Sequence, residues 1–522
     1  MAVSHPPHVL RRSRWLSLTA AAASLFTVLA GSAQAQSNVF DDLLEKLKEK
    51  GVLSQDEYDA LKAARDEERM EQRAERRRQA LRAAQEEEKQ EKAKTEAKTT
   101  LKGKFANGFV FETEDKENRL QFRGRVQGDY RTFSDDTAAN TFDIRRAFLT
   151  GEGRIAKYYT FDVTADFASP SGSPSTVLDV AWLNADWWKP VQVRIGQYKM
   201  PFSMDELTSD LYLDHLERDI GNPLVPAKTR GLMVHGAPLA GLTYALAYSN
   251  LNGKNANDLN QTVDGKEVIG RLTGDFAQFL SVKDSVLHLD GTFTDNTIPT
   301  VNSSSGSAAA NNAAPSFRTE ARGVTFFTPT VFTGEDVQRR RYGLEAAVAL
   351  GPVKLQGEYI TANYQGTAQG GPDYDKDLQA SYLTASWLIS GEKYAASYKD
   401  GSWGRIIPRS NFALGGGGWG AWELGLRYSQ FDGSDFGFVS ATNPAGTGAI
   451  DCTVAACGTL KADAWTLGLK WIMTPNTRLM LNYVQTNFDT PVTLTPAGGS
   501  AGGTVQSFDK EQAIIFRGQL DF

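Results

Sequence analysis

The 522-residue sequence predicts an all-β fold: a transmembrane antiparallel β-barrel of about 16 strands, preceded by a short N-terminal helical segment. Three observations lead to this prediction. Stretches after residue 104 alternate between polar and apolar residues, short and long connectors follow each other in turn, and the last stretch ends on Phe522. Strand side chains point alternately to two faces, so each stretch has an oily face and a wet face. A sheet in lipid must close, because its edge would otherwise lack hydrogen-bond partners.

The first 35 residues are typical of an export signal peptide. Three arginines within residues 11–14 form a basic start, an apolar stretch follows, and residues 33–35 match an A-x-A cleavage site. A buried or membrane-spanning helix is the alternative, and the small residues at the end of the stretch disfavour it. We expect residues 1–35 to be removed and the mature chain to lie outside the cytoplasm.

Residues 36–103 are rich in Glu, Lys, Arg and Ala and contain no Pro. We expect two helices that are separated at Gly51. Ser54 and Glu57 match the S-x-x-E capping box at the start of the second helix. This charged segment is predicted to lie in the periplasm. Apolar residues beyond Leu61 are sparse, so a coiled-coil assembly segment and a solvated helix both remain open.

Residues 104–522 are predicted to form the barrel domain. Short connectors such as "IAKY" and "WKPV" alternate with long ones such as "SPSGSPS". Outer-membrane barrels show this alternation, with tight periplasmic turns and longer outer loops, and their strands are even in number. Residues 104–114 are expected to lead into the barrel. The connector 392–421 is long for the short-turn side, and we expect it to fold inward.

The orientation of the two faces follows from the aromatic residues. In the closing stretch, Phe516 and Leu520 lie on one face, and Arg517 and Gln519 lie on the other. This pattern also suits a soluble sandwich. Aromatic residues toward the strand ends favour a membrane barrel, because such residues form girdles at the two lipid interfaces. These residues are Trp187, Trp188, Trp471, Phe488 and Phe522.

The polar face then becomes a pore wall that carries many basic groups. The predicted anion-binding and pore-lining residues are Arg123, Arg125, Arg131, Arg145, Arg146, Arg194, Arg341, Arg427, Lys470 and Arg517. Arg145 and Arg146 are adjacent, so strict alternation sends one of them to lipid unless a β-bulge turns both inward. The planar fork of arginine matches oxyanions, and a charged channel concentrates counterions. The alternative is the mixed-charge wall of a general pore.

Several classes of function are disfavoured. A net charge of −6 and a pI near 5.6 do not support nucleic-acid binding. Ser500 lies in "GGSAG", which matches the G-x-S-x-G motif of hydrolases, but no His follows it and its context is a Gly-rich loop. We therefore predict that the protein is not an enzyme and needs no cofactor.

The cysteines and histidines allow two further predictions. Cys452 and Cys457 lie close together in a Gly-rich stretch, and a local disulfide is favoured outside the cytoplasm over two free thiols. His5 and His8 belong to the signal peptide. The remaining histidines lie far apart in sequence, so no metal site is predicted; they are His215, His235 and His288.

Several stretches resemble one known family. The stretches "FDIRRAFLTGEGRIAKYYTFDVTADF", "GQYKMPFSMDELTS…LERD" and "AIIFRGQLDF" resemble the phosphate-selective porins O and P of Gram-negative outer membranes. The resemblance covers roughly residues 104–522. It implies a sixteen-stranded homotrimeric barrel in the cell outer membrane that passes small anions, phosphate or polyphosphate among them.

The resemblance also implies where the pore is narrowest. The third outer loop of that family folds inward, which places residues 203–228 of this chain at the constriction. The basic residues predicted there are Arg218, Lys228 and Arg230. This loop departs from the family pattern in being rich in Asp and Glu. Arg145 and Arg146 match the family's paired arginines.

Three functional hypotheses follow. The first is a passive anion channel whose partners are anions in transit and outer-membrane lipid. The alternative within the same class is a general, weakly selective porin whose N-terminal helices act in assembly or envelope tethering. The second hypothesis makes the barrel an anchor and gives the function to the N-terminal helices, for instance tethering the envelope or organising trimers. The remaining hypothesis, a secreted or barrel-embedded hydrolase, depends on Ser500 alone.

Overall fold

The computed structural model describes residues 40–168, 177–251, 253–254, 265–298, 316–328, 337–367, 373–436, 459–494 and 505–522. The predicted signal peptide, the Cys452–Cys457 pair and the Ser500 motif lie outside these residues. The chain divides into two compact units, Met1–Glu96 and Ala97–Phe522.

The described part of the N-terminal unit is helical, as predicted. Residues 40–49 form one helix and α2 (Gln55–Thr99) forms the next, with Gly51 between them at a φ of 68°. The capping box is confirmed: the Glu57 carboxylate accepts from the Ser54 backbone N–H at 3.0 Å, and Glu57 N–H donates to Ser54 Oγ at 3.3 Å. The structure buries no residue of α2. No described helix is long and apolar enough to cross a membrane.

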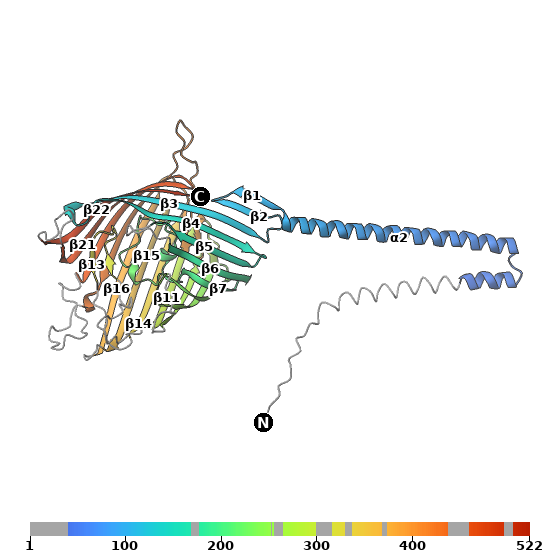
Figure 1. Cartoon of the computed structure of the whole chain (residues 1–522), viewed down its shortest axis with the longest axis horizontal. Coiled ribbons are helices and arrows are strands. Elements are labelled where there is room, and N and C mark those ends of the chain that lie inside the picture. The colour runs from blue at the N-terminus through green and yellow to red at the C-terminus, as the bar shows by residue number, and fades with distance from the viewer. Residues whose placement is uncertain are drawn as a thin grey trace, which may run out of the picture. The chain divides into compact units, whose positions relative to one another are not determined.

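The second unit is a closed antiparallel barrel of sixteen strands, as the sequence predicts (Figure 1). The final strand closes the barrel by pairing with the first, with Phe516 opposite Tyr130. In chain order the barrel strands are β3 (Arg119–Phe133), β4 (Thr141–Ile155), β5 (Tyr159–Asp166), β6 (Val177–Trp188), β7 (Val191–Lys199), β8 (Lys228–Leu239), β9 (Leu242–Asn250), β10 (Lys266–Asp275), β11 (Ser285–Ile298), β14 (Val337–Leu350), β15 (Val353–Thr367), β16 (Asp373–Leu388), β19 (Ala421–Asp432), β20 (Lys461–Thr474), β21 (Thr477–Leu494) and β22 (Gln506–Asp521).

A small hairpin precedes the barrel, where the sequence predicts a lead-in. β1 (Leu101–Phe105) pairs with β2 (Phe109–Thr113), and β2 pairs with the start of β3. β3 extends beyond β22, so its first residues have β2 as a neighbour and its later residues have β22. Phe522 continues the closing ladder, because its N–H donates to the Gly124 carbonyl at 2.9 Å and its carbonyl accepts from Gly124 N–H at 3.0 Å.

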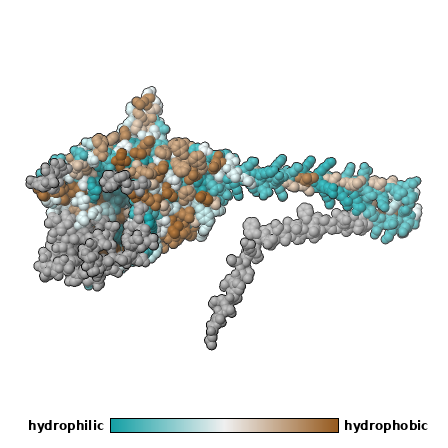
Figure 2. All heavy atoms as spheres, in the orientation of Figure 1, coloured by the Kyte–Doolittle hydropathy of each residue, from teal (hydrophilic) through white to brown (hydrophobic). Residues whose placement is uncertain are grey.

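The two faces of the barrel wall have the predicted polarity. On β22, Phe516 and Leu520 are exposed, whereas Arg517 and Gln519 are buried. Figure 2 shows brown, apolar patches on the outer surface of the barrel. The outer face therefore suits lipid, and the polar side chains point into the lumen.

The connector between β16 and β19 folds inward, as the sequence predicts. It carries β17 (Tyr398–Lys399) and β18 (Ser402–Trp403). Trp403 Nε1 donates to Gln356 Oε1 on the barrel wall at 2.6 Å, and Arg405 forms an ion pair with Asp521. The shorter elements elsewhere are β12 (Phe317–Arg318), β13 (Thr325–Phe327), α3 (Met204–Leu207), α4 (Phe276–Phe279), η1 (Ser134–Asp136), η2 (Asn222–Leu224), η3 (Tyr394–Ala396) and η4 (Ser434–Phe436).

Candidate functional site: a basic channel beside an acidic lumen loop

The connector between β7 and β8, residues 200–227, fills part of the lumen, and we call it the lumen loop. Many of its apolar side chains are buried, and Phe202 packs in a cluster with Ile269 of β10 and Ile360 of β15. Met204 packs in a second cluster with Trp403 of the inward connector. Burying large apolar side chains is worth roughly 1.5–3 kcal/mol each, so these contacts hold the loop against the β10–β16 side of the wall.

Basic wall residues bind the backbone of the lumen loop. Arg517 Nη1 donates to the Leu216 carbonyl at 2.6 Å, and Lys470 Nζ donates to the Leu213 carbonyl at 2.8 Å. In the opposite sense, the backbone N–H of Asp205 donates to Glu358 Oε1 at 2.7 Å. Hydrogen bonds to charged groups contribute more than neutral ones, about 1.5–3 kcal/mol each.

Two carboxylates of the lumen loop bind several arginines. Glu217 accepts from Arg145 Nε at 2.7 Å and from Nη2 of both Arg131 and Arg517 at 3.0 Å. Burial raises the pKa of the Glu217 carboxyl, but Arg145 and the other arginines outweigh burial and hold the pKa well below its usual value. The loop is therefore anchored by an ionised carboxylate.

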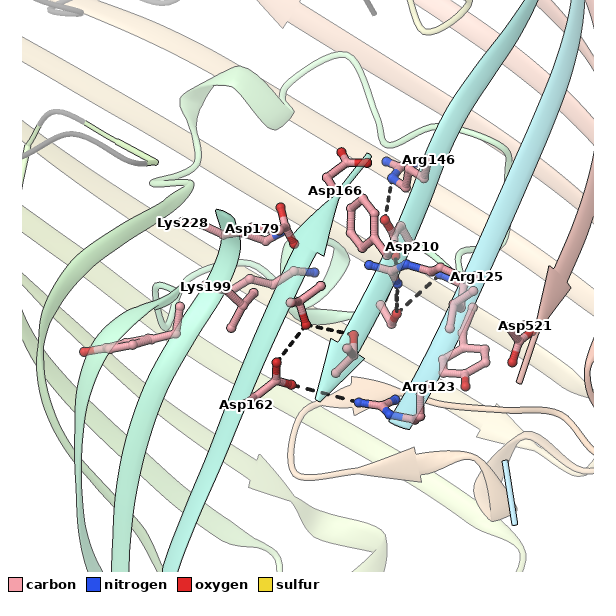
Figure 3. A pocket seen from close by; sticks show the side chains of 18 of the residues that line it. Arg123, Arg125, Arg146, Asp162, Asp166, Asp179, Lys199, Asp210, Lys228 and Asp521 are labelled. Carbon is pink, nitrogen blue, oxygen red and sulfur yellow. Dashed lines mark hydrogen bonds and ion pairs between the residues drawn. The ribbon is translucent and has the colours of Figure 1, made fainter. Parts of the chain in front are cut away.

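Asp210, earlier in the lumen loop, also binds arginines of the barrel wall. It forms ion pairs with Arg125 and with Arg146, and Figure 3 shows it between these two side chains. Burial raises the pKa of the Asp210 carboxyl, but Arg125 and Arg146 together lower it well below the usual value. This carboxylate therefore stays charged at neutral pH, and its charge partly cancels that of the two arginines.

A β-bulge brings both adjacent arginines of β4 inward. Gln127 lies opposite Arg146 and the next residue, Gly128, lies opposite Ile144, so Arg145 is the extra residue of the bulge. Arg145 then reaches Glu217, while Arg146 reaches Asp210. From the sequence, both side chains are expected to face the lumen only if a β-bulge is present, and the structure contains that bulge.

The lumen loop leaves a cavity of about 570 Å³ on the side of the barrel formed by β3–β8. A smaller cavity of about 170 Å³ lies toward the long connectors, next to residues 316–322. Arg145, Arg146 and Arg218 line both cavities. The two cavities therefore share three arginines.

Basic groups outnumber acidic groups on the lining of the larger cavity, and Figure 3 shows part of this lining. The ten basic residues are Arg123, Arg125, Arg145, Arg146, Arg194, Lys199, Arg218, Lys228, Lys254 and Arg405, and the six acidic ones are Asp162, Asp166, Asp179, Glu206, Asp210 and Asp521. Arg194 lies over the Trp182 ring at 4.3 Å, and it forms no ion pair with a carboxylate of the described residues. This surplus of cations gives the cavity a positive character.

The predicted wall residues fall into two groups. Arg123, Arg125, Arg145, Arg146 and Arg194 line the larger cavity. The others are buried and line neither of the two cavities, because they bind carboxylates and carbonyls beneath the loops; they are Arg131, Arg341, Arg427, Lys470 and Arg517. Arg427, for example, pairs with Glu320 at 2.6 Å, and Arg341 donates to the Leu224 carbonyl at 2.9 Å.

The predicted constriction residues need one correction. Arg218 lies in the lumen loop and donates to the Asp205 carbonyl at 3.0 Å. Lys228 and Arg230 instead belong to β8, because their backbones pair with Lys199 and Gln197 of β7. Lys228 still reaches the larger cavity, where it pairs with Asp179, whereas Arg230 lines neither of the two cavities.

Sequence reasoning missed three basic residues of the larger cavity, Lys199, Lys254 and Arg405. Lys199 ends β7 and donates to the Thr208 carbonyl at 3.0 Å. Arg405 lies on the connector that folds inward from the short-turn side. The unusual length of that connector was the available signal, since a long segment at a rim of tight turns has room to enter the lumen.

The sequence family described as "Phosphate-selective porin O and P" matches residues 120–490. The chain belongs to this family. Family membership makes the protein an outer-membrane porin and points to a channel rather than an enzyme. The matched region starts at the first barrel strand and ends within β21.

The porin is similar to known proteins along most of its length. It is 24% identical to Porin O of Pseudomonas aeruginosa over 410 residues, which cover 74% of this chain and 87% of that protein. Among solved structures, it is similar to an anion-selective porin from Comamonas acidovorans (13% identity, TM-score 0.46, 78% of this chain and 100% of that one). It is also similar to OmpT of Vibrio cholerae (10% identity, TM-score 0.45, 78% and 98%).

Proposed function

We propose that this porin is a passive, anion-selective channel whose solutes pass through the two cavities beside the lumen loop. The observation that carries the proposal is the excess of basic over acidic side chains on the larger cavity, together with the three arginines shared by both cavities. A positive lining in a narrow, low-dielectric channel attracts anions and repels cations. The family description and the name of the Comamonas relative agree with anions as the solute class.

Passage rather than capture follows from how the arginines are paired. Arg125 and Arg146 share Asp210, and Arg145 binds Glu217. A carboxylate beside each arginine competes with a passing anion, so affinity stays weak at every step. Weak serial sites favour conduction, because a tightly bound ion would block the channel. Small oxyanions such as phosphate suit the guanidinium fork at these positions.

The remaining parts of the chain complete the proposal. Residues 1–35 serve as the signal peptide, residues 36–103 as a periplasmic segment and residues 104–522 as the barrel domain. The long α2 helix, with no buried residue, suits contact with a neighbouring copy or with the envelope. The assembly is proposed to be a homotrimer, as the trimer form named for OmpT of Vibrio cholerae suggests for that porin.

The test is the reversal potential of purified protein in planar bilayers under a potassium chloride gradient. The wild type is expected to be anion-selective. The double variant Arg145→Gln/Arg146→Gln removes two positive charges, each worth about 1 kcal/mol of attraction for an anion in a solvated channel. Its anion-to-cation permeability ratio should be lower than that of the wild type by about tenfold or more. Arg154→Gln is the matched control, since Arg154 lies exposed on the same strand and lines neither cavity. A cation-selective wild type would overturn the proposal.

A further inference from the structure

A second cluster of polar side chains lies in the lumen on the other side of the lumen loop. His288 and Asp290 are two residues apart on β11, so both point inward, and Asp290 lies directly opposite Glu345 of β14. Their exposed fractions are 1%, 2% and 2%. None of the three lines either anion cavity. The cluster is therefore separate from the proposed channel.

Each of the three side chains has one nitrogen or oxygen atom that could bind a metal and that has no hydrogen-bond partner among the described residues. These atoms are His288 Nε2, Asp290 Oδ1 and Glu345 Oε1. One ligand atom from each residue lies within 4.8 Å of the other two. Buried polar atoms in folded proteins are nearly always paired, so three buried side chains that each keep an unpaired atom, in one close cluster, point to a ligand that they share.

The neighbouring groups hold these side chains in place from behind. Arg271 Nε donates to Asp290 Oδ2 at 2.6 Å, and Arg271 Nη2 donates to Glu345 Oε2 at 2.9 Å, so Arg271 occupies one oxygen of each carboxylate. The backbone of Ser203 and Met204 in the lumen loop also faces the Glu345 carboxylate. His288 Nδ1 lies 2.8 Å from Tyr398 Oη on the inward connector. An Nδ1–H that donates to this hydroxyl leaves a lone pair on Nε2, as in the outer shell of known metal-binding histidines.

The charge balance also favours a cation. Arg271 neutralises one of the two carboxylates, which leaves one negative charge. Glu358 lies opposite Glu345 on β15, is buried, and has an Oε2 atom without a partner in the described chain. Two buried negative charges in excess are costly in a low-dielectric region unless a cation or protons balance them.

We propose that His288, Asp290 and Glu345 form a binding site for one divalent transition-metal ion. One imidazole nitrogen and two carboxylate oxygens suit Zn²⁺ or Co²⁺ better than Ca²⁺ or Mg²⁺, which prefer sites made of oxygen alone. A bound ion would join β11 to β14 and, through the Tyr398 hydroxyl, to the inward connector. The role is structural: the ion stiffens the wall behind the lumen loop.

The experiment uses the full-length porin purified in detergent and treated with a chelator. Co²⁺ or Zn²⁺ is titrated, and binding is followed by calorimetry, by the visible absorption of Co²⁺, and by metal analysis after dialysis. The expected result is one ion per chain and a metal-dependent rise in thermal stability. His288→Gln and Glu345→Gln should each weaken binding at least 100-fold, and Tyr398→Phe should weaken it about tenfold.

The matched control is His235→Gln, because His235 also faces the lumen but has an amide neighbour, Asn184 Oδ1 at 2.7 Å, rather than a carboxylate. Each variant must keep the heat-dependent gel mobility of a folded barrel. Tyr398→Phe removes one hydroxyl, and it provides the test if the larger changes prevent folding. Wild-type protein that binds no stoichiometric metal would overturn the proposal, as would wild-type affinity in both His288→Gln and Tyr398→Phe.

Discussion

Neutralising Glu217 tests whether the lumen loop weakens anion binding in the channel. Arg145 has Glu217 as its one ion-pair partner among the described residues, whereas Arg131 and Arg517 also pair with Asp129. The Glu217→Gln variant therefore removes the ion-pair partner of Arg145 within the described chain. Asp210 and the backbone hydrogen bonds still hold the loop in place.

The magnitude follows from Coulomb's law. An anion bound on the open side of Arg145 lies about 6 Å from the Glu217 carboxylate, and at an effective dielectric constant of about 40 their repulsion is about 1.4 kcal/mol. Removing it should raise anion affinity about tenfold. The assay is the inhibition of chloride current by phosphate in planar bilayers, where the half-inhibitory phosphate concentration should fall by about that factor.

The matched control for this experiment is Glu267→Gln. Glu267 is also a buried carboxylate between two arginines, Arg339 and Arg341, but it lines neither of the two cavities. Its replacement should leave phosphate inhibition unchanged. A half-inhibitory phosphate concentration in Glu217→Gln equal to that of the wild type would refute the reasoning, whether or not the conductance of the variant were larger. Glu217 would then anchor the loop without repelling anions in the channel.

Two further predictions concern the loop and the helices. His215 is buried in the lumen loop, and burial lowers its pKa well below 6.5. The surrounding charged groups are Asp214, Lys354, Arg427 and Lys470. The imidazole is neutral in the docked loop and takes up a proton when the loop is released, so the free energy of docking falls by up to about 1.4 kcal/mol per pH unit below pH 6.5. Protease cleavage of the loop should therefore increase at acid pH in the wild type but not in His215→Gln. An equal increase in both proteins would contradict this prediction. Deleting residues 37–96 should leave conductance and selectivity unchanged, because no residue of either cavity lies there, and should lower only the trimer yield on native gels; altered selectivity would contradict it.

The barrel and the polarity of its faces could be predicted from sequence, because they depend on a period of two residues within each strand. Phe516 and Leu520 face outward and Arg517 faces inward for a reason that is local to β22. The capping box of Ser54 and Glu57 is local in the same way. The connector at 392–421 was correctly expected inside because its length conflicts with a tight turn.

Which arginines face water was decided by tertiary structure. Alternation places Arg123 and Arg517 on the same face, yet only Arg123 lines the larger cavity, because the lumen loop packs over Arg517 and accepts its hydrogen bonds. Strand register likewise joins Asp290 to Glu345, 55 residues later, and brings His288 to both. A sequence pattern records which face a side chain takes, whereas the groups it meets there depend on loops and strands that are distant in the chain.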